Sequence, residues 1–173
     1  MGKRSDFPRV EKDKYSTPRP AVFPLLPYLP TRTLFAEPCA GAGALIDILE
    51  GGGHVCTWAS DDAPERDDVV RESALDLDWD HIDAEMVITN PPWTRSLMHP
   101  IIDRLSARME CWFLFDADWA HTKQSSELIK RCSRIVSVGR VKWMPDSSHV
   151  GKDNCCWYEF LPGHTQGPRF IGR

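Results

Sequence analysis

The stretch "TLFAEPCAGAGALIDILE", residues 33–50, joins a short apolar run, a turn with two closely spaced glycines and a segment of helical spacing. Residues 33–38 have the composition of a buried strand, and residues 44–50 place apolar side chains at helical spacing until "GGG" ends the pattern. Gly41 and Gly43 let the backbone turn sharply and approach a ligand closely. The stretch therefore predicts a strand, a tight turn and a helix in succession.

The same alternation continues along the chain. Further strands are predicted at residues 54–60, 68–74, 84–90, 110–117, 134–143 and 154–162, and further helices at 96–109 and 123–132. Strands that alternate with helices form a largely parallel sheet, whereas the last two strands have no helix between them and form an antiparallel hairpin. We therefore predict a three-layer α/β sandwich whose mostly parallel, seven-stranded sheet ends in an antiparallel C-terminal hairpin.

The size of the chain favours a single domain. It has 173 residues, 42% of them hydrophobic, which suffices for one sizeable core. Residues 18–30, "PRPAVFPLLPYLP", contain five prolines and are expected to be extended, with at most a short helix. We expect residues 1–30 to form a proline-rich lead-in and residues 31–173 to form the one functional domain.

Charge and cysteine content narrow the functional class. The net charge is −4 and the isoelectric point about 5.8, values that are not typical of a polyanion binder of the histone or repressor kind. Residues 51–120 hold fifteen acidic and five basic residues, whereas residues 121–173 hold nine basic and four acidic ones. The six cysteines have no metal-binding spacing and the histidines are scattered, so no metal site is expected. No apolar run is long enough to span a bilayer, and we expect a soluble intracellular protein that contacts no membrane.

The glycine turn carries acidic residues that indicate the charge of its ligand. Glu37 stands at the start of the turn, and Asp61 ends the next predicted strand, 20 residues after Gly41. An acidic residue at that distance is typical of a group that holds ribose hydroxyls. A carboxylate beside a pyrophosphate would repel it, so the turn suits a cationic or amine-bearing ligand, unless it is simply a turn without a ligand.

The stretch "VITNPPWT" (87–94) follows a buried strand with an amide, two prolines and an indole. Asn90 offers a carboxamide oxygen and Pro91 a carbonyl, and the prolines fix the direction of both acceptors. Trp93 offers a flat ring on which a planar substrate can stack. Together they suit a planar group with an exocyclic amine; the alternative is a rigid loop entry with a packed tryptophan.

These motifs resemble those of the class I S-adenosylmethionine-dependent methyltransferases. "FAEPCAGAGAL" (35–45) is similar to motif I, "NPPW" (90–93) to the motif IV of amino-methyltransferases, and "YSTP" (15–18) to the motif that precedes motif I in adenine-specific enzymes. "WASDDAP" (58–64) resembles the end of the ribose-contacting second strand. The C-terminal third is similar to small phage or prophage DNA N6-adenine methyltransferases. The resemblance implies a Rossmann-like sheet and S-adenosylmethionine as cofactor.

The resemblance also implies a role for each motif residue. The residues implied in cofactor binding are Thr17, Pro18, Glu37, Pro38, Gly41, Gly43, Asp61, Asp62, Glu72 and Asn90. Those implied in catalysis are Asn90, Pro91, Pro92 and Trp93, where the two acceptors prepare the target nitrogen and Trp93 stacks on an extruded base. Trp93, Lys142, Lys152 and Asn154 are expected to bind the substrate.

The resulting hypothesis is methylation of adenine N6 in DNA, in the cytoplasm of a bacterial or phage-infected cell. Alternatives are adenine N6 in RNA, cytosine N4 in DNA, the glutamine amide of a release factor, and a catalytically silent module that binds cofactor or nucleic acid. DNA is favoured over RNA as partner. Since no separate target-recognition domain is expected, sequence specificity should be low or should come from a specificity partner or a homo-oligomer.

Overall fold

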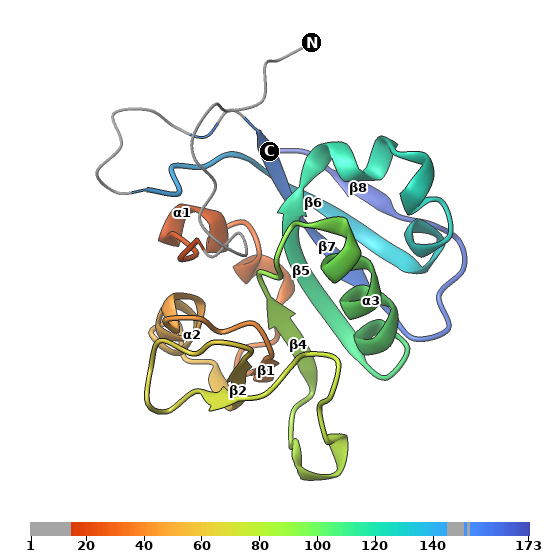
Figure 1. The fold of residues 1–173 in the computed structure, drawn as a ribbon. Helices are drawn as coiled ribbons and strands as arrows, with labels where there is room; N and C mark the ends of the chain where they lie inside the picture. Colours follow the sequence, from red (N-terminus) through yellow and green to blue (C-terminus); the bar gives the residue numbers. More distant parts are fainter. Residues whose placement is uncertain (1–14, 145–150, 152) are drawn as a thin grey trace.

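The computed structural model describes residues 15–144, 151 and 153–173, which form an α/β fold around one mixed sheet (Figure 1). Among these residues the sheet has eight strands in the order β3-β2-β1-β4-β5-β7-β6-β8. The strands are β1 (Leu34–Glu37), β2 (Val55–Asp61), β3 (Val70–Arg71), β4 (Met86–Thr89), β5 (Glu110–Asp116), β6 (Cys132–Arg140), β7 (Asn154–Phe160) and β8 (Arg169–Ile171).

Most neighbouring strands run parallel, and β7 is antiparallel to both β5 and β6. The predicted class, a mostly parallel sheet with an antiparallel C-terminal hairpin, is thus confirmed. Apolar runs explain the central strands: all four residues of β4 are buried, as are the five middle residues of β5. Strands buried on both faces need apolar side chains throughout, which is why these two are continuous in apolar and β-branched residues.

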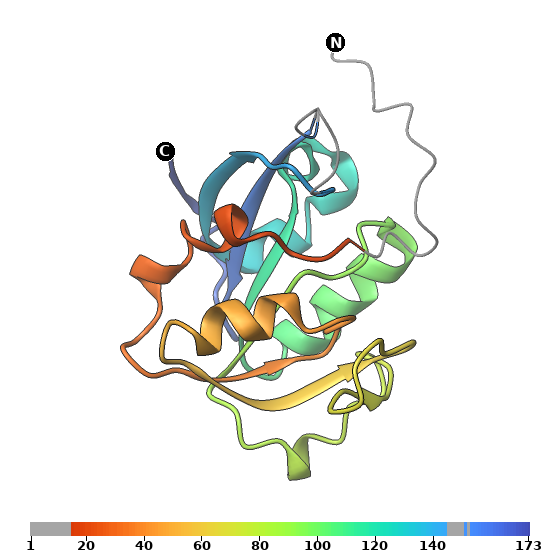
Figure 2. The ribbon, with the colours of Figure 1, turned by 90° about the vertical axis from the view of Figure 1, so that its left-hand side faces the viewer.

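Helices cover the two faces of the sheet and give it three layers (Figures 1 and 2). The short helix α1 (Arg19–Val22) and α2 (Ala44–Glu50) share one hydrophobic cluster with one face of the strands. Helix α3 (Arg95–Ser106) packs on the other face with Met98, Ile102 and Leu105 in a second cluster. Its Pro100 lies in the N-terminal half of the helix. No helix among the described residues is both long enough and apolar enough to cross a membrane.

Two sequence predictions differ from the structure. The sheet has an eighth strand, β8, which pairs in parallel with β6 at the sheet edge. The helix predicted over residues 123–132 is wrong, because this segment forms short 3-10 turns at Lys123–Ser125 and Leu128–Arg131. The hydroxyl of Ser125 donates to the carbonyl of Thr122, and such local side-chain bonds compete with a continuous helix. The remaining 3-10 turns lie at Leu26–Tyr28, Trp79–His81 and Ala117–His121.

The strand order brings the loops that follow β1 and β4 together at the carboxyl ends of these two neighbouring strands. The chain proceeds outward from β1 to β2 and β3, then returns to place β4 on the other side of β1. In sheets of this kind ligands bind beyond the carboxyl ends of the strands, at the point where the order reverses. The glycine turn after β1 and the N-P-P-W segment after β4 both leave the sheet at this point.

Candidate functional site

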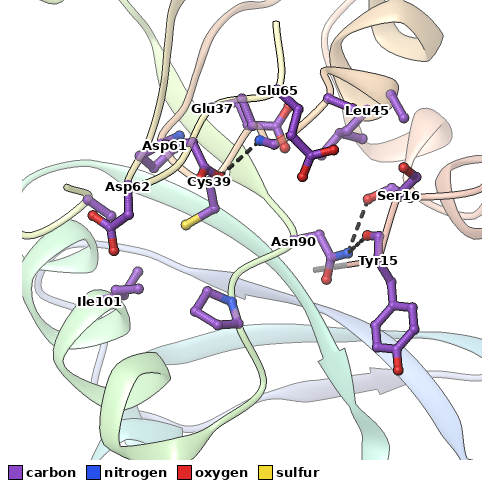
Figure 3. A pocket seen from close by; sticks show the side chains of 18 of the residues that line it. Tyr15, Ser16, Glu37, Cys39, Leu45, Asp61, Asp62, Glu65, Asn90 and Ile101 are labelled. Carbon is purple, nitrogen blue, oxygen red and sulfur yellow. Dashed lines mark hydrogen bonds between the residues drawn. The ribbon is translucent and has the colours of Figure 1, made fainter. Parts of the chain in front are cut away.

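A cavity opens at this point of the sheet edge, between the loops that follow the parallel strands (Figure 3). It is lined by the lead-in, the glycine turn, the exits of β2, β3 and β4, and helix α3. The lining residues are Tyr15, Ser16, Thr17, Glu37, Pro38, Cys39, Ala40, Gly41, Ala42, Ala44, Leu45, Asp61, Asp62, Glu65, Ser73, Ala74, Leu75, Asn90, Pro92, Leu97 and Ile101. Glu37 and Asn90, predicted to serve a cofactor and a target amine, therefore share one cavity.

Glu37 is the buried acid of this cavity. It is the last residue of β1, its side chain is 2% exposed, and its Oε2 has no hydrogen-bond partner among the described residues. Burial raises the pKa of Glu37 well above 4.5, and the nearby carboxylate of Asp61 raises it further. An unpaired buried carboxyl oxygen at a cavity wall favours a ligand with a donor or a positive charge.

Asp61 ends β2 and is buried beside the glycine turn. Its Oδ2 accepts a hydrogen bond from the Gly41 amide at 2.9 Å, and its Oδ1 accepts one from the Ala63 amide at 2.8 Å. Gly41 has φ +52°, a conformation that favours glycine. Asp61 therefore lines the cavity and also fixes the shape of the adjoining glycine turn, which lines it too.

The lining is strongly acidic. Asp62 and Glu65, on the segment after β2, join Glu37 and Asp61 at the cavity, and no lysine, arginine or histidine is among the described residues that line it. Four acidic side chains without a lining cation disfavour a pyrophosphate and favour a cationic ligand, which would also favour ionisation of Glu37.

Asn90 is held in one orientation by the lead-in. Its Nδ2 donates to Thr17 Oγ1 at 3.2 Å and to the carbonyl of Tyr15 at 3.5 Å. Its Oδ1 accepts a hydrogen bond from the indole Nε1 of Trp93 at 3.1 Å. The amide nitrogen therefore faces the lead-in, and the oxygen faces the N-P-P-W loop.

The other residues of this loop differ in exposure. Pro91 is buried, whereas Pro92 is partly buried and lines the cavity. Trp93 is partly buried and lies outside the lining, although its hydrogen bond attaches it to Asn90. Its ring meets that of Trp143 edge to face, with the centroids 5.4 Å apart. Trp143 belongs to the segment after β6, so the loops that follow β4 and β6 touch at this edge of the sheet.

The predicted substrate-binding residues lie near this contact. Lys142, just after β6, and Asn154, at the start of β7, are exposed. Both belong to the sheet edge that carries Asn90, because Arg140 pairs with Asn154 and Cys155 with Asp116 at the end of β5. Lys152 lies outside the described residues.

Several basic residues of the C-terminal third pair with acidic side chains. Lys130 pairs with Glu127, Arg131 with Asp103, and Arg134 with the buried Glu159.

Three predicted cofactor residues do not line the cavity. Pro18 precedes α1, Gly43 caps the N-terminus of α2, and Glu72 follows β3 with its Oε2 buried and without a partner among the described residues. The lining also contains residues that the sequence did not single out. Tyr15 and Ser16 belong to the "YSTP" motif, and Ser73–Leu75 lie at the end of the strand predicted over residues 68–74, so both groups had a signal. Leu97 and Ile101 belong to the helix predicted over residues 96–109, which had no signal for a site.

Comparison with known proteins supports the fold. No family model matches the sequence, and a search of curated proteins finds no significant match. Among solved structures, a proposed RNA methyltransferase from Pyrococcus horikoshii aligns with a TM-score of 0.62 at 16% identity, covering 92% of this chain and 93% of that one. A proposed class I S-adenosylmethionine-dependent methyltransferase from Listeria monocytogenes aligns with a TM-score of 0.61 at 12% identity, covering 93% and 66%.

The M protein of the type I restriction enzyme EcoKI aligns with a TM-score of 0.55 at 15% identity. The alignment covers 92% of this chain and 48% of that one, so this chain spans about half the length of the EcoKI subunit. At these identities the likeness concerns the fold, which is the one that these methyltransferases share.

Proposed function

We propose that the protein is an S-adenosylmethionine-dependent methyltransferase that acts on the exocyclic amine of a nucleobase, with adenine N6 in DNA as its target. The observation that carries this proposal is the shared cavity of Glu37 and Asn90 at the reversal point of the sheet. One side of the cavity offers the buried carboxyl group of Glu37, whose Oε2 has no partner among the described residues, and the other offers the oriented carboxamide of the N-P-P-W motif.

The cavity suits the charge of the cofactor. S-adenosylmethionine is a sulfonium cation with an amino acid tail, and it supplies an electrophilic methyl group. Glu37 would hold its amine, while Asp61 and Asp62 would face its ribose, next to the close-approaching backbone of Gly41. The apolar side chains of Leu75, Leu97 and Ile101 offer a surface for a flat ring.

The exit of β4 would receive the target amine. The Asn90 carboxamide oxygen and the Pro91 carbonyl would accept its two hydrogens, which makes the nitrogen lone pair more available for in-line attack on the methyl group. Trp93 would stack on the extruded base and offset part of the few kcal/mol that unstacking costs. Positioning supplies most of the rate in this proposal, and no covalent intermediate is needed.

The structural relatives are compatible with either DNA or RNA as the substrate. One relative is described as an RNA methyltransferase, and another is the M protein of a type I restriction enzyme. We favour adenine because Asn90 matches the adenine-type motif, and DNA because the restriction subunit shares the fold. A modification subunit of a proposed type I restriction enzyme is among the structural relatives, and we propose that the sequence specificity of this chain is low or is supplied by a partner.

The test is incubation of the protein with isotope-labelled S-adenosylmethionine and, separately, DNA, RNA or a release factor. Each product is digested, and the modified nucleoside or amino acid is identified by mass. Labelled N6-methyladenine in DNA, lost in Asn90→Ala, supports the proposal. Label in RNA, on cytosine N4 or on glutamine would redirect it to the corresponding alternative. Tight cofactor binding without any labelled product would favour a silent binding module.

A further inference from the structure

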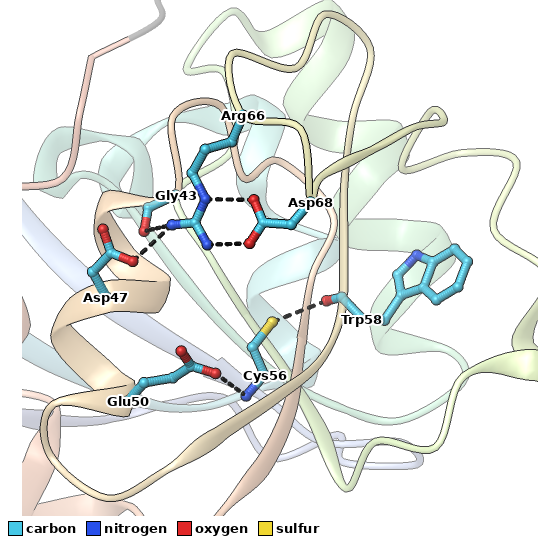
Figure 4. A network of polar contacts seen from close by, with 7 residues as sticks. All are labelled: Gly43, Asp47, Glu50, Cys56, Trp58, Arg66 and Asp68. Carbon is cyan, nitrogen blue, oxygen red and sulfur yellow. Dashed lines mark hydrogen bonds and ion pairs between the residues drawn. The ribbon is translucent and has the colours of Figure 1, made fainter.

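Arg66 forms a clasp just outside the candidate cofactor cavity (Figure 4). Its Nε and Nη2 donate to the two carboxylate oxygens of Asp68 at 2.6 and 2.5 Å, and its Nη1 donates to Asp47 Oδ1 at 2.7 Å. The same Nη1 also donates to the carbonyl of Gly43 at 3.4 Å. Asp47 and Gly43 belong to the start of α2, so Arg66 joins the segment after β2 to that helix.

Arg66 does not line the cavity, but its neighbours in sequence and space do. Asp62 and Glu65 precede it on the same segment, and both face the cavity. Three further hydrogen bonds join the end of β2 and the segment after it to the glycine turn. Two come from β2, Ala40 N to Ser60 O at 3.0 Å and Gly41 N to Asp61 Oδ2 at 2.9 Å, and one comes from the segment, Glu65 N to Gly41 O at 3.1 Å. Together with the contacts of Arg66, these bonds join the glycine turn, which carries Glu37, to the part of the chain that carries Asp61, Asp62 and Glu65.

The positive charge of Arg66 also affects the acidic residues that line the cavity. Four acidic side chains around one cavity repel each other when they are ionised, and a nearby cation offsets part of this repulsion. Arg66 lowers the pKa of Glu37, against the larger effects of burial and of Asp61 that raise it. Removal of Arg66 would therefore leave the acidic side chains less firmly held and would increase the electrostatic repulsion between them.

Gly43 accommodates the clasp. It has φ +77°, and a Cβ atom at this position would overlap the guanidinium group of Arg66. A glycine here thus serves the backbone conformation and also leaves room for the arginine. The N-terminal end of α2 and Arg66 fit each other closely.

We propose that Arg66 is a positioning residue for the cofactor cavity: it fastens the segment after β2 to the start of α2 and so holds the glycine turn and the acidic wall in the geometry that binds S-adenosylmethionine. This inference rests on the proposed function. Arg66 acts through Glu65, Gly41 and Gly43 and touches no ligand itself. Its planar fork matters, because a lysine retains the charge but cannot form the paired bonds to Asp68.

The test is calorimetric binding of S-adenosylmethionine to the wild-type protein, Arg66→Met and Arg66→Lys, with Arg131→Met as the matched control. Arg131 also pairs with a carboxylate, that of Asp103, and is similarly exposed, at 26% against 29% for Arg66. We expect Arg66→Met to weaken binding about ten-fold, since an ordered binding wall becomes mobile. Arg66→Lys should recover part of that loss, and Arg131→Met should bind as the wild type does.

Melting of the ligand-free variants separates positioning from general stability. Partly exposed ion pairs contribute little to stability, so ligand-free Arg66→Met and Arg131→Met should melt at similar temperatures. If Arg66→Met does not fold, Asp47→Asn and Asp68→Asn loosen the clasp from either side and should each weaken binding. Wild-type affinity in Arg66→Met overturns the positioning role. A wild-type protein that binds no S-adenosylmethionine overturns the proposed function instead.

Discussion

The indole Nε1 of Trp93 donates a hydrogen bond to Oδ1 of Asn90 over 3.1 Å, so the oxygen proposed to receive the target amine already has a partner within the protein. A tryptophan can make this bond, whereas a phenylalanine at the same position cannot. The target amine must therefore share the Asn90 oxygen with the indole or displace it.

Two substitutions of Trp93 distinguish the contribution of its aromatic ring from that of its N–H group. Trp93→Phe keeps an aromatic face and should retain methyl transfer, while Trp93→Ala should lose on the order of ten-fold or more, because base stacking contributes about 1–3 kcal/mol per base. Initial rates on an adenine-containing oligonucleotide measure both. Equal losses in the two variants would show that the N–H group, not the ring, is what matters.

Substitution of Asn90 and of its support should give graded losses. Asn90→Ala removes the oriented acceptor and should reduce kcat on the order of 10²-fold, as the loss of a positioned catalytic hydrogen bond typically does. Thr17→Val removes the side-chain acceptor for Asn90 Nδ2 and should reduce kcat about two- to ten-fold, the value of one ordinary hydrogen bond. Single-turnover rates at saturating cofactor report the step itself. A Thr17→Val loss as large as that of Asn90→Ala contradicts this ranking.

The buried Glu37 should make the stability of the ligand-free protein depend on pH. The unfolded carboxyl group ionises near its usual pKa of about 4.5, whereas the folded one keeps its proton to higher pH. The folded state then binds more protons between these values, so stability falls as the pH rises through this window. Glu37→Gln should remove this dependence and melt above the wild type at pH 8.

The same substitution should weaken binding of S-adenosylmethionine, because the carboxylate that would hold the cofactor amine is lost. Calorimetry at pH 8 measures this affinity in both proteins. A Glu37→Gln protein that is more stable and also binds the cofactor fully would remove Glu37 from the proposed site.

Asp61 has a structural and a binding role to separate. Asp61→Asn keeps the size of the side chain, but its NH2 group cannot accept from an amide, so one of the bonds to Gly41 and Ala63 is lost. We expect about ten-fold weaker cofactor binding and a lower melting temperature, since a buried amide is left without its acceptor. Calorimetry and thermal melts on the same samples test both, and unchanged affinity rejects the assignment of Asp61 to the cofactor site.

The sheet was predictable because its pattern is local. β4 and β5 are continuous apolar runs, and α2 follows its glycine turn at the predicted residues. The strand β8 has three residues between Gly167 and Gly172, too few for a periodic signal. Secondary structure that depends on pairing with a distant strand leaves little trace in the sequence around it.

The candidate site was predictable where a motif carries it and not where folding assembles it. Glu37, Asp61 and Asn90 stand at strand ends, so the sequence placed them at one edge. The contact of Trp93 with Trp143 depends on how two loops 50 residues apart meet, and the clasp of Arg66 depends on a loop path that no pattern fixes.

The lead-in determines where a chimaera that contains the candidate site of this protein has to begin. Thr17 and Tyr15 anchor the Asn90 amide, and the indole of Trp157 donates to the carbonyl of Ala21, although all three lead-in residues precede the first strand. A chimaera that takes over the chain only from Leu34 would carry all eight strands of the described residues and still leave that amide unsupported. The portable unit therefore starts at Tyr15 or earlier, ahead of the sheet it serves.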